Sequence, residues 1–260
     1  MNYFSITGAS KGIGEAIAWQ CAKKGLNLLL VARSEVLLKT LAEELMTAHN
    51  IEANYFAVDL TISDAVSSIF KYADEQQIKL TGCVNNAGLG TWGSFTKDNP
   101  KNFKTVNLLN IQSLVDITHT FLNKLPENKK GYLLNVASTA AYQPTPYMAL
   151  YSASKAYVYS LTRALREELK HRNINITCLC PGPTKTDFAD SEALGELDKI
   201  NQKVAMSAEK VAKTAVRGLF KNEAVVIPGM SNFLGAKAAA IFPDNVVVPL
   251  VGSIFKKMER

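Results

Sequence analysis

The sequence predicts an α/β fold: a doubly wound parallel sheet of about seven strands with helices on both faces. Short apolar runs alternate with helical patterns, and a glycine-rich turn follows the first run. Apolar runs without polar alternation are typical of strands covered on both faces. Strand–helix alternation favours parallel strands joined by right-handed crossovers. We expect the strands at residues 3–7, 26–32, 53–58, 82–86, 131–138, 174–180 and 224–228.

Helices are expected between these strands. The first begins near Gly12 and stops at Gly25, a residue suited to the position after a helix. Apolar residues at helical spacing predict further helices over residues 34–49, 100–125 and 150–172. Since no repeat, low-complexity tract or linker interrupts the chain, we expect one domain over residues 1–260, with 229–260 as an apolar C-terminal extension.

Composition and charge are those of an ordinary globular protein. The chain has 260 residues, of which 47% are hydrophobic and 20% charged, enough for one large core. The net charge is +6, but Lys and Arg are spread along the chain. We therefore expect a mildly basic surface and no nucleic-acid partner.

Cysteines and histidines indicate a reducing compartment and no metal site. The four cysteines form no Cys-x-x-Cys pair, and the three histidines lack ligand spacing. We expect buried free thiols and a cytoplasmic protein without a signal peptide. No apolar stretch is long enough for a transmembrane helix. Residues 233–255 are the most apolar segment. This segment could pack on the domain, on a partner subunit or on a membrane surface.

The turn "TGASKGIG" lies between the first strand and the first helix. Glycines permit a tight turn and a close approach of a pyrophosphate, which the helix N-terminus attracts. A plain strand–helix turn is the alternative. In the functional interpretation, a dinucleotide phosphate lies against five residues of this loop: Gly8, Ser10, Lys11, Gly12 and Ile13.

The end of the second strand predicts the form of the nucleotide. An acidic residue near this place would bind the ribose 2′-hydroxyl of NAD, but the chain has Ala32 followed by Arg33. Arg33 and Lys11 could instead pair with a 2′-phosphate. The alternative is that both are solvated surface cations. We predict NADP(H) in preference to NAD(H).

Tyr151 and Lys155 are four residues apart in the fourth predicted helix and so share one face. Alone, such a pair is usually a surface feature. Its functional interpretation is an acid–base couple, because a nearby cation lowers the pKa of a phenol.

Several motifs in order resemble the short-chain dehydrogenase/reductase family, over about residues 3–228. Besides the glycine loop and the Tyr151–Lys155 pair, the matching motifs are "NNAG" (85–88), Asn107 in "TVNLLN", Ser138 thirteen residues before Tyr151, and "PGPTKT" (181–186). Thr184 departs from the Val or Ile that is frequent in the family. The resemblance implies a Rossmann-like fold.

The resemblance also implies the catalytic roles. Tyr151 would donate a proton to a substrate carbonyl, or take one from an alcohol. Lys155 would bind the nicotinamide ribose and lower the pKa of Tyr151, and Ser138 would stabilise the carbonyl oxygen. Asn107 would hold a water molecule connected to Lys155. The structural alternatives are a turn residue for Ser138 and a polar core residue for Asn107.

Other cofactor contacts follow from the same resemblance. Asp59 and Leu60 follow the third strand, where the family contacts adenine, although Asp59 could equally be a turn residue. The remaining predicted contacts follow the fourth and sixth strands: Asn85, Ala87, Gly88, Pro181, Gly182, Thr184 and Thr186.

An apolar and aromatic set is expected around the substrate, above the C-terminal ends of the strands. We therefore expect a hydrophobic carbonyl substrate, such as a fatty acyl, steroid-like or aromatic ketone, and a mobile lid over residues 187–206. Several of these residues could instead be core or subunit contacts. The set is Trp92, Phe95, Tyr142, Pro144, Tyr147, Met148 and Phe188.

The leading function is an NADPH-dependent carbonyl reductase with a small-molecule substrate. The alternatives are an NAD-dependent alcohol dehydrogenase and a non-catalytic protein that senses the dinucleotide. The resemblance further implies a homodimer or homotetramer formed through the helices at 100–125 and 150–172.

Overall fold

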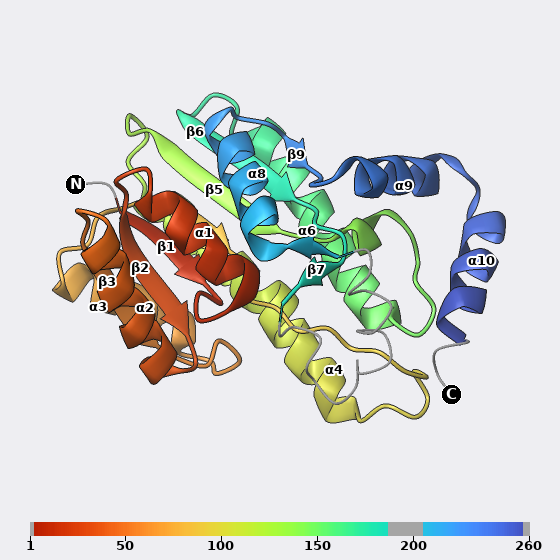
Figure 1. Ribbon diagram of the computed structural model, residues 1–260. Helices are drawn as coiled ribbons and strands as arrows, with labels where there is room; N and C mark the ends of the chain where they lie inside the picture. Colours follow the sequence, from red (N-terminus) through yellow and green to blue (C-terminus); the bar gives the residue numbers. More distant parts are fainter. Residues whose placement is uncertain (1–2, 187–204, 257–260) are drawn as a thin grey trace.

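A parallel sheet of seven strands forms the centre of the computed structural model, which describes residues 3–186 and 205–256 (Figure 1). The strand order is β3-β2-β1-β4-β5-β6-β9, so the predicted doubly wound sheet is confirmed. The last strand is shorter than predicted. A separate parallel pair joins β7 (Thr184–Lys185) to β8 (Met206–Ser207). The sheet strands are β1 (Tyr3–Thr7), β2 (Asn27–Ala32), β3 (Ala53–Ala57), β4 (Leu80–Asn85), β5 (Gly131–Val136), β6 (Ile174–Leu179) and β9 (Val225–Val226).

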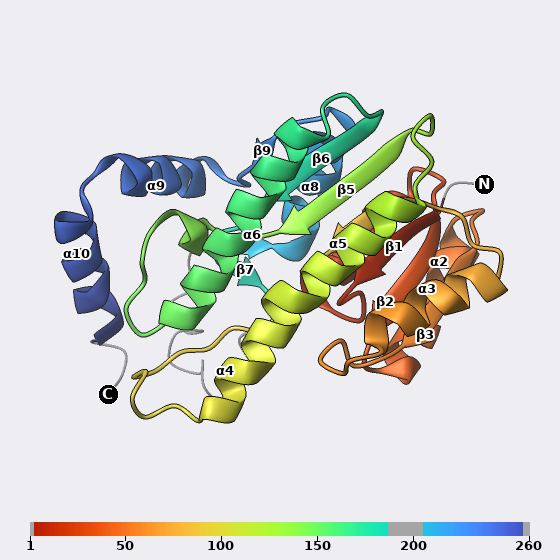
Figure 2. The ribbon, with the colours of Figure 1, turned by 180° about the vertical axis from the view of Figure 1, so that it is seen from behind.

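Helices cover both faces of this sheet (Figures 1 and 2). One face packs against α1 (Gly12–Ala22), α2 (Glu35–Ala48) and α8 (Ala208–Phe220). The other packs against α3 (Ala65–Glu75), α5 (Ser113–Lys124) and α6 (Ala149–Glu168). The bounds predicted for α1, α2 and α6 agree to within four residues, whereas α3 and α8 were not placed individually.

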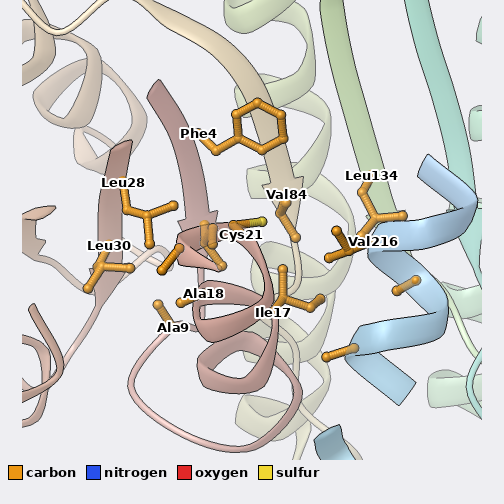
Figure 3. Packing of buried hydrophobic residues seen from close by; sticks show 14 of the residues in the cluster. Phe4, Ala9, Ile17, Ala18, Cys21, Leu28, Leu30, Val84, Leu134 and Val216 are labelled. Carbon is orange, nitrogen blue, oxygen red and sulfur yellow. The ribbon is translucent and has the colours of Figure 1, made fainter. Parts of the chain in front are cut away.

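The core on the first face is built from alternate strand residues and the inner sides of α1 and α8. Phe4 and Leu28, from neighbouring strands, belong to one cluster with Ile17 of α1 and Val216 of α8 (Figure 3). These four side chains are buried. This packing holds the start of α1 against the end of β1, where the glycine loop lies.

The predicted helix over 100–125 is interrupted. It consists of α4 (Pro100–Asn107), a π-helical turn η1 (Leu108–Gln112) and α5. A π-helical turn closes hydrogen bonds over five residues instead of four, so it changes which side chains face inward. This change decides which asparagine reaches the interior.

The direction of chain winding reverses between β1 and β4. From β1 the chain proceeds to β2 and β3 on one side, and β4 begins the other half of the sheet. Such a reversal leaves a crevice beyond the carboxyl ends of the two strands, where doubly wound proteins bind ligands. The glycine loop after β1 and the NNAG segment after β4 meet there.

Two helices extend beyond the sheet at the C-terminal end. We call α9 (Met230–Ile241) and α10 (Asp244–Lys256) the C-terminal arm. In both ribbon views α9 leads away from β9, and α10 then turns beside the segment before α6 (Figures 1 and 2). Among the described residues, no helix has the length and apolar character needed to cross a bilayer.

Candidate active site

The conformation of the glycine loop is fixed by hydrogen bonds to the segment that follows β4. Gly8 and Gly12 have φ angles of +64° and +62°, in the left-handed region that favours glycine. Asn86 Nδ2 donates to the carbonyl oxygens of Thr7 at 3.0 Å and Gly8 at 3.2 Å. The Thr7 hydroxyl in turn accepts from the Asn86 amide at 3.0 Å. Asn86 therefore shapes the glycine loop from the segment after β4.

The loop shows the tight backbone geometry of a phosphate cradle. A Cβ added at Gly14 would lie 2.2 Å from the carbonyl oxygen of Gly8, so the turn closes only with glycine. One added at Gly12 would lie 2.9 Å from Cγ2 of Thr186. The structure thus brings Thr186, a predicted cofactor contact, against the glycine loop. The residues present fit a dinucleotide in the crevice.

The Pro181–Thr186 segment is tied to the end of β5. The amide of Thr139 donates to the carbonyl oxygen of Pro181 at 2.9 Å. Thr184 Oγ1 donates to the carbonyl oxygen of Gly182 at 2.9 Å, which closes the local turn. The segment therefore lies beside Ser138.

Ser138, Tyr151 and Lys155 converge at the carboxyl end of β5. The buried Ser138 hydroxyl accepts from the amide of Ala140 at 3.1 Å. Burial raises the pKa of Tyr151, and a hydrogen bond with Ser138 acts to lower it. The Lys155 ammonium lies 5.8 Å from the centroid of the Tyr151 ring. The phenol, hydroxyl and ammonium therefore meet as predicted.

Lys155 is a buried cation without a carboxylate among its described contacts. Its Nζ donates to the carbonyl oxygen of Val136 at 2.9 Å. Burial lowers the pKa of Lys155 to about 8, against the opposing influence of Cys178 and Cys180. A perturbed buried lysine beside a tyrosine in a crevice is typical of a functional site.

The structure corrects the choice of asparagine. Asn107, at the end of α4, is exposed and does not lie with Lys155. Asn110, within η1, is buried and accepts from the amide of Leu89 at 2.8 Å. A Cβ on Gly88 would lie 3.2 Å from Asn110 Oδ1 and 3.3 Å from Lys155 Nζ, so both groups line the same spot. A continuous α-helix was the wrong premise, because the π-helical turn brings the later asparagine inward.

Asn85 lies in a buried polar network beneath the site. Its Nδ2 donates to Asn135 Oδ1 and to Thr118 Oγ1, both at 2.9 Å. Asn135 Nδ2 donates in turn to Thr162 Oγ1 at 3.0 Å. The network joins β4 and β5 to α5 and α6. The Asn85 side chain is therefore engaged within the protein, and a cofactor contact from it would have to come through the backbone.

At the other end of the crevice, Arg33 and Asp59 follow adjacent strands. Arg33 is exposed, and Ala32 before it is buried. Asp59 Oδ1 accepts from the amide of Thr61 at 2.9 Å and from its hydroxyl at 2.8 Å. The hydrogen bond from the Thr61 amide contributes most to lowering the pKa of Asp59. The bond from the Thr61 hydroxyl and the charge of Arg33 lower it further. Asp59 thus closes a turn with Thr61, while its contact with adenine stays a prediction, and its neighbour Leu60 is buried.

Part of the predicted apolar set surrounds a small hollow beside α6. Trp92, Phe95 and Tyr147 line this hollow of about 20 Å³. Tyr147 has a φ of +66°, an unusual conformation for a bulky residue and one that is often found at functional loops. Tyr142 instead packs against Tyr159, with ring centroids 4.9 Å apart. Phe188 and most of the predicted lid lie outside the described residues.

A larger hollow, of about 580 Å³, lies between α3 and α5. Its lining includes Lys71, Asp74, Glu75 and Lys124, and contains none of the predicted site residues. Volume alone therefore does not locate the site. The concentration of buried polar and titratable groups does.

Comparisons with known proteins agree with this geometry. The short chain dehydrogenase family profile matches residues 2–196. An uncharacterized oxidoreductase of Staphylococcus epidermidis is 28% identical over 86% of this chain and 95% of its own length. The 17-beta-hydroxysteroid dehydrogenase type 3 of Mus musculus is 32% identical over 82% of this chain and 67% of its own.

A solved short-chain dehydrogenase from Sphingobium yanoikuyae, in complex with NADPH, superposes with a TM-score of 0.82. It is 26% identical, and the match covers 92% of this chain and 93% of that one. Together with the glycine cradle and the meeting of Ser138, Tyr151 and Lys155, these matches show that the chain belongs to the short-chain dehydrogenase/reductase family of NAD(P)-linked oxidoreductases, which act on C=O and CH–OH groups.

Proposed function

We propose that this protein is an NADPH-dependent reductase of an apolar carbonyl compound. The observation that carries the proposal is the convergence of Tyr151, Ser138 and the buried Lys155 beside a glycine cradle. A bound nicotinamide supplies the hydride, which no protein side chain can provide. The chain's own residues bind the carbonyl and deliver the proton.

Tyr151 is the general acid in this proposal. Its phenol protonates the carbonyl oxygen as hydride reaches the carbon, and Ser138 donates a hydrogen bond to the same oxygen. Burial keeps Tyr151 protonated before the reaction, since it disfavours the phenolate. When Lys155 is charged, it stabilises the phenolate that the reaction leaves behind.

Asn110 takes the positioning role that the sequence interpretation gave to Asn107. It lies next to Lys155 at Gly88 and is bonded to the backbone of Leu89. In the proposal, the amide positions a water molecule that returns a proton through Lys155 to Tyr151.

The preference for NADPH rests on Arg33 and Lys11. Arg33 is exposed at the end of β2, where a guanidinium can form two hydrogen bonds with a 2′-phosphate. The buried Ala32 offers no carboxylate to a ribose hydroxyl. An NAD-dependent alcohol dehydrogenase is the alternative, which the absence of an acid at Ala32 disfavours.

The substrate proposal is an apolar ketone, aldehyde or 3-oxoacyl compound. Trp92, Phe95 and Tyr147 give the described substrate side an aromatic wall. The murine relative's name indicates a steroid substrate for that protein, which fits the same chemical class. A cytoplasmic location and a homodimer or homotetramer through α5 and α6 complete the proposal.

The decisive experiment follows NADPH absorbance with the purified protein and a panel of acyl thioesters, steroids, aromatic ketones and small aldehydes. Tyr151→Phe should lower kcat by about 10²–10⁴-fold while NADPH still binds, because only the proton donor is lost. Tyr157→Phe, an exposed tyrosine of the same helix, is the matched control. Tight NADPH binding without turnover of any substrate by the wild type would favour the sensor alternative.

A further inference from the structure

The first turn of α9 lies directly against the Pro181–Thr186 segment. A Cβ added at Gly182 would lie within 2.6 Å of the three terminal atoms of the Asn232 side chain, which real Cβ atoms do not do. The Asn232 amide therefore occupies the place of a side chain at position 182. The φ of Gly182 is outside the left-handed region, so its own backbone would admit alanine. The contact with Asn232, and not the backbone conformation, is what requires a glycine here.

The Asn232 side chain is itself fixed in orientation. Its Nδ2 donates to the carbonyl oxygen of Pro228 at 2.8 Å and to the sulfur of Met206 at 3.7 Å, which uses both hydrogens of the amide. Gly229 precedes the helix with a φ of +89°, and a Cβ added there would lie 2.8 Å from the same sulfur. The start of α9, the entry to β8 and position 182 therefore form one close-packed junction.

The neighbours of Gly182 are tied down on the opposite side. The carbonyl oxygen of Pro181 accepts from the amide of Thr139 at 2.9 Å, next to the catalytic serine. The carbonyl oxygen of Pro183 accepts from the amide of Met206 at 3.0 Å. Both bonds flank Gly182 without touching it, so the start of α9 supplies the contact that fixes the middle of this segment.

We propose that Asn232 is a positioning residue for the nicotinamide. The inference rests on the proposed function, in which residues 181–186 hold the nicotinamide end of the cofactor. Asn232 acts through the backbone of Gly182, which it presses from the side of α9. Without the amide, the segment can relax into the vacated space, and the nicotinamide is then held less precisely.

The alternative is a purely structural role, in which Asn232 stabilises the start of α9 through Pro228 and does nothing else. Two ligands distinguish these roles: NADPH, and 2′-phospho-ADP-ribose, which shares its adenine, phosphates and both riboses but lacks the nicotinamide. Loss of a positioning residue weakens the binding of NADPH alone. A general defect in the fold weakens the binding of both ligands.

The test is calorimetric titration of the full chain with each ligand. We expect Asn232→Ala to raise the dissociation constant of NADPH by about 5–10-fold, and to leave that of 2′-phospho-ADP-ribose unchanged. Ser231→Ala, at the exposed neighbouring residue of α9, is the matched control and should change neither value. Equal weakening of both ligands in Asn232→Ala, or no weakening of either, would overturn the inference.

A second pair of variants tests the contact itself. Gly182→Ala places a methyl group against the Asn232 amide and should raise the dissociation constant of NADPH by about 10–100-fold. Adding Asn232→Ala removes the opposing atoms, so the double variant should bind NADPH within about threefold of Asn232→Ala alone. A double variant that stays as weak as Gly182→Ala would overturn the inference but leave the proposed function intact. A wild type that does not bind NADPH would overturn both.

Discussion

Nδ2 of Asn110 donates a hydrogen bond of 3.1 Å to the hydroxyl of Ser154, the residue before Lys155 in α6. The same amide group exchanges hydrogen bonds with the backbone of Leu89, at 2.8 Å and 2.9 Å. One buried side chain thus joins the π-helical turn, the loop after β4 and the catalytic helix. Its removal would loosen three segments that must agree in position for proton transfer.

Single alanine substitutions at Asn110 and at Asn107 should therefore differ in their effect on kcat. We expect Asn110→Ala to lower kcat for carbonyl reduction by about 10²-fold, because the donor and acceptor that orient the segment beside Lys155 are lost. Asn107→Ala should keep wild-type kcat, since that side chain is exposed. Steady-state kinetics with saturating NADPH measures both. A loss of kcat in Asn107→Ala with none in Asn110→Ala would return the role to Asn107.

The buried ammonium of Lys155 should reduce the stability of the fold. Its pKa falls from 10.5 to about 8, which corresponds to about 3 kcal/mol, offset by about 1 kcal/mol for the bond to Val136. Lys155→Met should then unfold at higher denaturant at pH 7, by about 1–3 kcal/mol, while losing turnover. Urea unfolding followed by circular dichroism measures the difference. A less stable variant would show that the ammonium contributes net stability.

The same pKa shift sets a pH dependence. Below about pH 8 Lys155 is protonated in both the folded and the unfolded state, so the burial penalty is fully present. Between about 8 and 10.5 the unfolded state holds the extra proton, and the wild type gains stability as the pH rises. The advantage of Lys155→Met over the wild type should therefore shrink through this window. A constant difference from pH 7 to 10.5 would contradict the depressed pKa.

Cofactor preference should respond to Arg33. We expect Arg33→Ala to weaken NADPH binding by about 10–100-fold, the contribution of one charge-assisted guanidinium–phosphate contact, and to leave NADH binding unchanged. Fluorescence titration of both nucleotides gives the ratio. Lys39→Ala, at an exposed lysine of α2, is the control for general surface charge. A parallel loss for both nucleotides would show that Arg33 does not read the 2′-phosphate.

Gly14 tests the geometry of the glycine loop. Alanine at a helical position ordinarily stabilises by about 0.5–1 kcal/mol relative to glycine. Here the added methyl would lie 2.2 Å from a backbone oxygen, so Gly14→Ala should instead destabilise by about 1–3 kcal/mol and weaken NADPH binding. Thermal unfolding with and without NADPH measures both effects. Gly235→Ala, where the methyl meets open space, should give the ordinary stabilising sign.

Local pattern was enough to predict the sheet, and the family resemblance pointed to three groups that the structure brings together. Buried parallel strands such as β1 and β2 are continuous apolar runs, and their order follows from the helices between them. Ser138, Tyr151 and Lys155 could be proposed together because the resemblance rests on their spacing along the chain. Hydrogen-bond partners such as Val136 and Leu89 could not be predicted, since they depend on how distant segments pack.

Asn107 and the C-terminal arm show where pattern failed. Apolar spacing over 100–125 is compatible with a continuous α-helix, and nothing in it reveals one turn of π-helix. Asn110 is buried and Asn107 exposed, a difference that follows from the backbone of this turn and not from the apolar pattern. The arm was recognised as apolar, but only its placement shows that the described part of the chain leaves it uncovered.

The network of Asn85, Asn135, Thr118 and Thr162 has a consequence for redesign of this enzyme. It fixes the distance between two helices from inside the sheet, out of reach of the loops that face the substrate. Under the proposed function, exchange of loop residues such as Trp92 and Phe95 should therefore admit other carbonyl compounds while the proton-transfer groups keep their spacing. Residues that contact the substrate and residues that set the catalytic geometry thus lie in different parts of the chain. We expect a library of variants in the loops to retain turnover, and a library of variants in the network to lose it.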